Sequence, residues 1–282
     1  MPEIVAPKWA DYLVFALPPL SYNGGILPST AVFDLEHQPT TFDVLPWLSI
    51  AKTMGAEKVH LVFDGKIQNW KYSTAEAFKR LGNITIPAIE LMGLPWTIGA
   101  KKPGFTVGYH FGHLNEAFKT KGKIEKLPLI KSEDSGYVTV TLRDTIRNKS
   151  RDSNRDEWNK VISWLEEKGE RVIVLDDGDA YGYTLTLKKR WSIYSNAKMN
   201  LGVNSGPMSM CAISDAPYMI FRCFIDNQEG REMENFRAKG GFPKGSQMLF
   251  KNDAQEMIYE EDTFENITRA YERVFEKQRI AA

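Results

Sequence analysis

In the first half of the chain, short apolar and β-branched runs alternate with stretches of helical periodicity. Residues 30–35 (TAVFDL) and 58–63 (KVHLVF) are typical of buried strands, because both runs are short and rich in apolar residues. The elements predicted in this half are strand 30–35, helix 42–54 closed by Gly55, strand 58–63, a helix over 73–91 interrupted near Pro87, and a short strand at 105–109. This order favours a parallel sheet with helices on its faces.

A polar segment, residues 119–136 (KTKGKIEKLPLIKSEDSG), separates the two halves of the chain. It is rich in Lys, Gly, Ser and acidic residues and has little periodicity, which indicates an interdomain linker. We therefore expect one domain at residues 1–128 and a second at residues 129–282, since 282 residues exceed the usual size of a single domain.

The alternation is clearer after this segment. Ser153, with Asp156 three residues later, forms an approximate capping box for the first helix of this half. The predicted elements are strand 137–142, helix 153–169, strand 171–175, helix 189–196, strand 199–203, helix 206–213, strand 218–221 and an amphipathic closing helix at 262–277. The whole pattern predicts an α/β fold of two Rossmann-like lobes with mainly parallel sheets.

Composition narrows the classes of function. The chain has 36 basic and 36 acidic residues, whereas a nucleic-acid binder usually has a basic excess. The only two cysteines, Cys211 and Cys223, imply no disulfide framework. No apolar run is long enough to span a membrane, and residues 12–20 are too short and proline-rich for a signal peptide. We expect a soluble cytoplasmic protein that does not bind nucleic acid.

Basic residues gather in the loop at residues 143–153 (RDTIRNKSRDS), which follows a predicted strand and ends at Ser153. They are Arg143, Arg147, Lys149 and Arg151. Ligands of open parallel sheets bind at the carboxyl ends of the strands, and guanidinium groups and helix N-termini both favour phosphate. The loop is therefore a candidate phosphate site. The alternative is a solvated loop whose basic residues pair with nearby aspartates.

Two further loops follow predicted strands of this half. In the turn Asn204-Ser205-Gly206-Pro207, glycine allows close backbone approach and proline suits a helix start, so free amides could hold a diphosphate. The alternative is an ordinary strand-to-helix turn capped by serine. Asp176 and Asp177 open an acidic loop that could bind ribose hydroxyls or Mg²⁺, or could be a solvated turn.

A cluster in the first half offers candidates for proton transfer. Asp34, Glu36 and His37 follow the first predicted strand, and any of them could deprotonate an acceptor hydroxyl. The alternative is a structural role beside a helix start with Thr40 or Thr41 as N-cap.

His110 and His113, near Glu116, superficially suggest metal ligands. Their spacing of three residues across a glycine differs from the spacing of four that is usual for paired ligands on a helix, and no cysteine lies nearby in the sequence. We expect a structural role and no metal site.

These residues resemble the two-lobed (GT-B type) glycosyltransferases, particularly the bacterial heptosyltransferase-like group. The matching segments of the second half are TVTLRDT, SNRDEW, RVIVLDD and LGVNSGPMSMCAISDAPYMIF. The segment TAVFDLEHQPTTFDVLPWLSIAKTMGAEKVHLVFDG resembles a little-characterised branch of bacterial proteins grouped with glycosyltransferases. Heptosyltransferases have a histidine after the glycine-proline turn, where this chain has Met208 and Ser209.

The resemblance implies a nucleotide-diphosphate sugar held by the second half and an acceptor held by the first. The acceptor would be a glycan or a lipid-linked molecule, the latter with peripheral membrane contact, and neither a cofactor nor a metal ion is implied. Arg143 and Arg151, with amides near Ser205 and Gly206, would neutralise the departing diphosphate. Two alternatives remain, a nucleotide-sugar epimerase and a non-catalytic protein that binds nucleotides or sugar phosphates.

Overall fold

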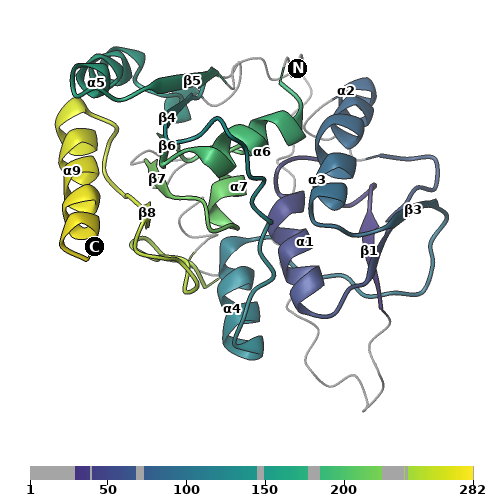
Figure 1. The fold of residues 1–282 in the computed structure, drawn as a ribbon. Coiled ribbons are helices and arrows are strands. Elements are labelled where there is room, and N and C mark those ends of the chain that lie inside the picture. Colours follow the sequence, from purple (N-terminus) through teal and green to yellow (C-terminus); the bar gives the residue numbers. More distant parts are fainter. Residues whose placement is uncertain are drawn as a thin grey trace.

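The computed structural model describes residues 29–38, 40–67, 73–144, 149–176, 185–223, 238 and 241–281. In this part of the chain, two parallel sheets pack against helices (Figure 1). Every pair of neighbouring strands within each sheet is parallel. The predicted α/β class with mainly parallel sheets is confirmed.

The first half contains a three-stranded sheet in the order β1-β2-β3. Its elements are β1 (Thr30–Asp34), α1 (Val44–Thr53), β2 (Lys58–Val62), α2 (Thr74–Arg80), a π-helical turn (Leu81–Thr85), α3 (Ile86–Leu91), β3 (Trp96–Gly99) and α4 (Phe111–Lys121). Gly55 follows α1 with a φ of +105°, which glycine adopts without strain. The first two strands and the first helix are as predicted.

The prediction of a third strand at residues 105–109 is wrong. The third strand is β3 (Trp96–Gly99), and Phe105 forms only an isolated bridge with Ala31 of β1. The middle residues of β3, Thr97 and Ile98, are exposed, so this edge strand lacks the apolar pattern of a buried strand.

The helix predicted over residues 73–91 is one helical segment with a π-helical turn in its middle. It begins after Ser73, whose Oγ accepts a hydrogen bond from the Glu76 backbone N at 3.2 Å. The π-helical turn directly precedes α3, which carries Pro87 near its start. Because proline cannot donate a backbone hydrogen bond, it disturbs the regular helical ladder there. The interruption near Pro87 is confirmed.

Helix α4 was not predicted, and its last three residues, 119–121, fall within the expected linker. It ends at Lys121 and is followed by Gly122 with a φ of +70°. Its buried residues include Gly112 and Asn115, which weaken the apolar periodicity that would otherwise reveal a helix. The division of the chain into domains near residue 128 stays a prediction.

The second half contains a five-stranded sheet in the order β5-β4-β6-β7-β8. Its elements are β4 (Val138–Leu142), a 3-10 turn (Lys149–Arg151), α5 (Arg155–Glu167), β5 (Val172–Asp176), α6 (Leu187–Asn196), β6 (Met199–Val203), α7 (Ser209–Ala212), β7 (Tyr218–Phe221), β8 (Gln255–Met257) and α9 (Phe264–Ala281). All elements predicted for this half are present, although α7 is shorter than expected. The short edge strand β8 was not predicted.

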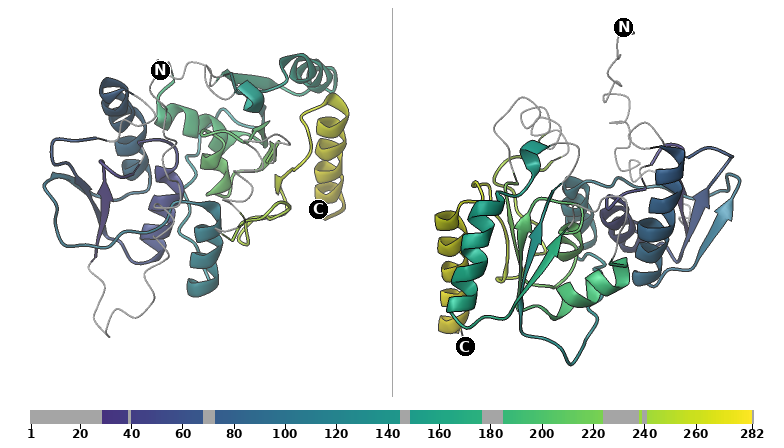
Figure 2. Two further views of the ribbon diagram at one scale, coloured as in Figure 1. Left: turned by 180° about the vertical axis from the view of Figure 1, so that it is seen from behind. Right: turned by 90° about the horizontal axis from the view of Figure 1, so that it is seen from above.

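Helices cover both faces of this sheet. Helices α5 and α9 lie side by side on one face, and α6 and α7 lie on the opposite face, toward the first half (Figure 2). The core between the first face and its helices is apolar. It includes Val140 of β4, Trp158 of α5 and Ile267 of α9. On the other face Thr141 is fully buried and forms a hydrogen bond of 2.8 Å with the Tyr194 hydroxyl.

One apolar cluster continues from the first half into the second. It joins Phe33 and Trp47 with residues of α6 and α7 such as Trp191 and Met210. The indole N–H of Trp191 also donates to the carbonyl oxygen of Pro128, at 2.7 Å. The two sheets therefore share a core through the helices between them.

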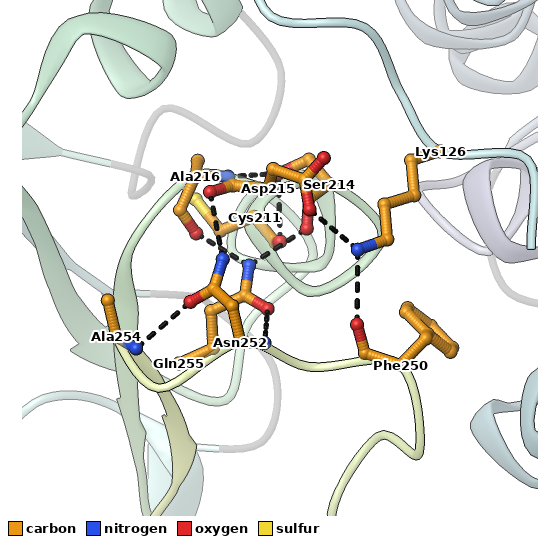
Figure 3. A network of polar contacts seen from close by, with 9 residues as sticks. All are labelled: Lys126, Cys211, Ser214, Asp215, Ala216, Phe250, Asn252, Ala254 and Gln255. Carbon is orange, nitrogen blue, oxygen red and sulfur yellow. Dashed lines mark hydrogen bonds and ion pairs between the residues drawn. The ribbon is translucent and has the colours of Figure 1, made fainter.

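A polar network holds the segment after α4 against loops of the second half (Figure 3). Lys126 Nζ lies 2.6 Å from Asp215 Oδ1. Gln255, which is 1% exposed, donates from Nε2 to the carbonyl oxygens of Ser214 and Ala216, at 2.8 Å each. These contacts satisfy the buried amide within the protein, so we assign the network a structural role.

Helix α9 closes the second half against α5. Just before it, Asp262 is 2% exposed, and its Oδ2 accepts hydrogen bonds from Asn154 N and Trp158 Nε1 at 2.8 Å each. This carboxylate therefore joins the start of α9 to the start of α5. None of the helices in the described ranges combines the length and the apolar character that crossing a membrane requires.

Candidate functional site

The strand order of the second sheet has its point of divergence between β4 and β6. These two strands are neighbours, but the chain leaves β4 toward β5 on one side and leaves β6 toward β7 on the other. In doubly wound sheets of this order, ligands bind where the connections diverge. The loops at residues 143–153 and 204–207 follow these two strands.

The loop after β4 is closed by contacts between Arg143 and Ser153. Arg143 N donates to Ser153 Oγ, and Ser153 N donates to Arg143 O, both at 2.9 Å. The expected capping role of Ser153 is wrong, because its hydroxyl serves Arg143 and α5 begins one residue after Asn154. The half-buried Arg143 guanidinium lies 3.5 Å from Asp152 Oδ1, and its Nε makes no hydrogen bond within the described structure.

Arg151 connects the two candidate loops. Its Nη2 donates to the carbonyl oxygen of Asn204 at 3.0 Å, so the loop after β4 and the turn after β6 are held together. Lys149, in the same 3-10 turn, is exposed. Arg147 lies outside the described residues.

The turn after β6 packs against the first half. A Cβ at Gly206 would lie 2.7 Å from Phe42 Cδ2, so this position has no room for a side chain. Ser205 is 5% exposed, and its Oγ has no hydrogen-bond partner among the described residues. Pro207 leads into the turn before α7, where Ser209 N donates to Gly206 O at 3.1 Å. The turn thus contains a buried hydroxyl that a ligand could satisfy.

Asp176, at the end of β5, takes part in an ion-pair bridge. Arg155 Nη2 donates to Asp176 Oδ2 at 3.0 Å and to Asp144 Oδ2 at 3.2 Å. The hydrogen bond with Asp176, helped by the charges of both carboxylates, raises the pKa of Arg155. Ribose hydroxyls would therefore compete with Arg155 for Asp176. Asp177 lies outside the described residues.

Arg222 is a further arginine at this edge that sequence reasoning missed. It directly follows β7 with a φ of +50°, and its Nη1 donates to the Asp152 carbonyl oxygen at 2.6 Å. Its Nε lies 3.0 Å from Glu261 Oε2. Asp152 also pairs with Arg143, so Asp152 contacts both Arg143 and Arg222. The rule that singled out Arg143, the first residue after a buried strand, would also have found Arg222.

Asp34, Glu36 and His37 form a turn at the carboxyl end of β1. Asp34 Oδ2 lies 3.0 Å from His37 Nδ1, and Asp34 Oδ1 accepts a hydrogen bond from Glu36 N at 2.9 Å. Glu36 Oε1 lies 3.3 Å from Lys66 Nζ. The His37 side chain is 57% exposed. An accessible imidazole held by a carboxylate is an arrangement that general bases use.

The start of α1 differs from the sequence expectation. Neither Thr40 nor Thr41 is the N-cap; that position is Asp43, whose side chain makes no capping bond. Thr40 Oγ1 donates to the carbonyl oxygen of Ala77 at 3.3 Å, and Thr41 Oγ1 donates to Asp43 Oδ2 at 2.8 Å. Phe42, which lies between Thr41 and Asp43, is the residue that contacts the turn after β6.

His110 and His113 lie at the start of α4. His113 Nδ1 accepts a hydrogen bond from His110 N at 3.3 Å, and burial lowers the pKa of His113. Among the residues whose positions are described, no cluster of three or more His, Cys, Asp or Glu side chains is arranged to bind a metal ion.

The structure brings the second-half residues to one edge of the sheet. Arg143, Arg151, Ser153 and the turn at 204–207 lie at the carboxyl ends of β4 and β6, and Asp176 lies at the neighbouring strand end. The Asp34–His37 pair belongs to the other sheet. Guanidinium groups and a buried hydroxyl at neighbouring strand ends can bind an oxyanion.

Comparison with known proteins gives partial likenesses. No protein-family model and no curated protein matches the chain. The chain is similar to the iron-containing dodecameric glycosyltransferase TibC of enterotoxigenic E. coli, at 14% identity and a TM-score of 0.39, over 68% of this chain and 57% of TibC. It is also similar to the E. coli heptosyltransferase WaaC with ADP, at 13% identity and a TM-score of 0.37, over 88% of this chain and 73% of WaaC.

A third similar structure is a universal stress protein from Archaeoglobus fulgidus, at 14% identity and a TM-score of 0.18, over 64% of this chain and 88% of that protein. The aligned part spans less than two thirds of TibC. At these identities and TM-scores, the likenesses concern the arrangement of α/β elements and carry no activity over to this chain.

Proposed function

We propose that this chain is a glycosyltransferase that moves a sugar from a nucleotide-diphosphate donor to a hydroxyl group of a glycan or lipid-linked acceptor. The carrying observation is that the arginine loop and the Ser205 turn follow adjacent strands, β4 and β6, at the point where the strand connections diverge. The motif resemblance of the second half to the donor-binding half of two-lobed glycosyltransferases supports the same position.

In this proposal, the donor diphosphate lies at the carboxyl ends of β4 and β6. Arg143 and Arg151 would neutralise the negative charge that develops on the leaving diphosphate, which is where transition-state stabilisation is most effective. Each arginine already contacts a protein oxygen, on Asp152 and Asn204 respectively. The Arg143 Nε makes no hydrogen bond within the described structure, so this guanidinium has a donor for a phosphate oxygen. The buried Ser205 hydroxyl would supply another hydrogen bond.

The acceptor would be activated from the first half. The His37 imidazole, held through Nδ1 by Asp34, would take the proton from the acceptor hydroxyl. The acceptor oxygen would form a bond to the anomeric carbon of the sugar while the bond from that carbon to the phosphate oxygen breaks. The electron pair of that bond leaves with the nucleotide diphosphate. Glu36 is the second candidate base, and its Oε1 lies 3.3 Å from Lys66 Nζ.

Donor binding is tested by calorimetry and thermal shift with UDP, GDP, ADP and CMP, alone and as sugar conjugates. We expect one nucleotide to raise the Tm of the wild type, and Arg151→Gln to weaken its binding about tenfold or more. Arg269→Gln is the matched control, because Arg269 is an exposed arginine of α9 paired with Glu260. If no nucleotide or nucleotide sugar binds the wild type, the proposal is wrong.

Turnover is tested with Asp34→Asn and His37→Asn. Both variants should bind the donor as the wild type does but release little nucleotide when an acceptor is added. An epimerase would convert the nucleotide sugar without releasing nucleotide, and a non-catalytic protein would show neither reaction. Normal transfer by both variants would exclude the assigned base.

A further inference from the structure

Arg190, in the first turn of α6, is a buried cation that forms no ion pair with any carboxylate the structure describes. It is 6% exposed, and its Nη1 and Nη2 donate to the Tyr194 hydroxyl at 3.1 Å and to the Asp176 carbonyl oxygen at 3.2 Å. Both acceptors are neutral oxygens. In the part of the chain that the structure describes, no carboxylate forms an ion pair with Arg190.

This situation differs from that of the other buried arginine side chains. Arg80 is also 6% exposed, but its Nε lies 2.7 Å from Glu76 Oε1. Arg143 has Asp152 beside it. Burying a charge without a partner is costly, and hydrogen bonds of a guanidinium to charged acceptors are typically shorter, at about 2.7–2.9 Å. A guanidinium in this environment favours a ligand that brings a negative charge.

The surroundings of Arg190 strengthen this conclusion. Lys188 and Lys189 precede it, and the first turn of α6 contains no acidic residue, so positive charges gather where the helix dipole is also positive. Asp176 O marks the carboxyl end of β5, and Tyr194 contacts Thr141 near the carboxyl end of β4. Arg190 therefore lies at the same sheet edge as the candidate donor site, on the side covered by α6.

A second buried polar group at this edge points the same way. The Ser205 hydroxyl, in the turn after β6, has no hydrogen-bond partner among the described residues. Buried hydroxyl groups are normally paired, so the Ser205 hydroxyl also indicates a ligand at the carboxyl edge of the sheet.

We propose that Arg190 binds a phosphate group of the ligand and that this phosphate supplies the missing counter-charge. The inference rests on the proposed function in placing the ligand at this edge, and it adds a residue and an anionic ligand class that the strand-end loops do not provide. Two of the five guanidinium N–H groups are used by Tyr194 and Asp176, which leaves donors for a phosphate oxygen.

The test uses the full chain with inorganic pyrophosphate as the probe. We expect pyrophosphate to raise the Tm of the wild type, and Arg190→Gln to bind it about tenfold more weakly or worse. Arg190→Lys keeps the charge without the fork and should retain part of the affinity. Arg269→Gln, which removes an exposed arginine of α9, should bind as the wild type does.

The stability of the ligand-free variants separates binding from a structural role. Removing an uncompensated buried charge should leave the Tm of Arg190→Gln without ligand close to that of the wild type. A large loss of Tm together with an unchanged response to pyrophosphate would make Arg190 structural and overturn the inference. Should Arg190→Gln not fold, Arg190→Lys decides: wild-type pyrophosphate affinity in that variant would overturn the inference.

The outcomes also separate this inference from the proposed function. Pyrophosphate binding that depends on Arg190, without binding of any nucleotide sugar, would support the inference and contradict the transferase. Nucleotide-sugar binding and transfer that survive unchanged in Arg190→Gln would support the transferase and overturn the inference. If the wild type does not bind pyrophosphate, the inference is wrong. The binding experiments with nucleotides and nucleotide sugars would then still test the proposed transferase activity.

Discussion

Gly206 occupies the place where the turn after β6 meets the first half. The ring of Phe42 fills the space that a side chain would need, with Cδ2 2.7 Å and Cγ 3.0 Å from the position of a Cβ. The neighbouring Ser205 hydroxyl belongs to the candidate donor site. A single methyl group at residue 206 therefore affects both the contact between the halves and the site.

We expect Gly206→Ala to lower the free energy of unfolding by about 1–3 kcal/mol and to weaken nucleotide binding, because either the Phe42 ring or the Ser205 turn must move. Gly82→Ala is the control. A Cβ at Gly82 meets nothing within 4 Å, and alanine favours helix, so its stability should be unchanged or slightly higher. Urea denaturation measures both, and equal midpoints for Gly206→Ala and the wild type would contradict the steric argument.

His113 makes stability depend on pH. Burial lowers its pKa below the ordinary value of 6.5 in the folded chain, so below that pH the unfolded chain binds more protons. The stability that the neutral His113 contributes is fully present above pH 6.5. The free energy of unfolding falls as the pH falls below that value toward the lowered pKa of the folded chain. His113→Asn keeps an acceptor for His110 N but does not titrate. Between about pH 7 and about pH 5, the wild type should lose more stability than this variant; parallel losses would refute the assignment.

At the scale of elements, the predictions succeeded where burial is visible in the residues themselves. β4 and β6 are short runs with every residue buried, and the pattern of α5 repeats apolar residues at helical spacing. Strand β8 was not predicted, because two of its three residues are polar. Gln255 is nevertheless buried, since it forms hydrogen bonds with a loop that is distant in the sequence. Such burial depends on tertiary partners, which local sequence does not reveal.

Asp262 is one of the carboxylates that attach α9 to α5; another is Glu157, whose Oε2 accepts a hydrogen bond from Phe264 N at 2.7 Å. In Asp262→Ala, Asn154 N and Trp158 Nε1 both lose their acceptor, so we expect the free energy of unfolding to fall by about 2–4 kcal/mol. Glu261→Ala is the control, because the ion pair that the structure describes for this exposed residue is with Arg222, and its loss should cost no more than about 1 kcal/mol. Guanidinium denaturation followed by tryptophan fluorescence measures the difference. Equal losses in the two variants would show that the buried bonds of Asp262 do not hold α9 in place.

At the scale of the whole molecule, the sequence predicted which edge of the second sheet carries the candidate site but not its internal contacts. Arg143 and the turn at 204–207 were found because both follow strands, and the strand order placed them side by side. The bond from Arg151 to Asn204 was not foreseeable, because residues far apart in sequence meet there. Arg190 lies within a helix, so no rule about strand ends identifies it.

The shared core predicts that the two halves unfold together. Helix α3 packs against α6, and α1 packs against α7, so the fully buried Trp191 and Met210 belong to the same apolar cluster as Trp47. A fragment of residues 129–282 would expose this face, and each large apolar side chain that loses its burial costs about 1.5–3 kcal/mol. We expect the fragment to be unfolded or self-associated, and the full chain to show one transition with coincident circular dichroism and fluorescence midpoints. The opposite result would be a fragment that is monomeric, unfolds cooperatively and binds the same nucleotide as the full chain. The second half would then be an independent domain, and the contacts between α3 and α6 would contribute little to its stability.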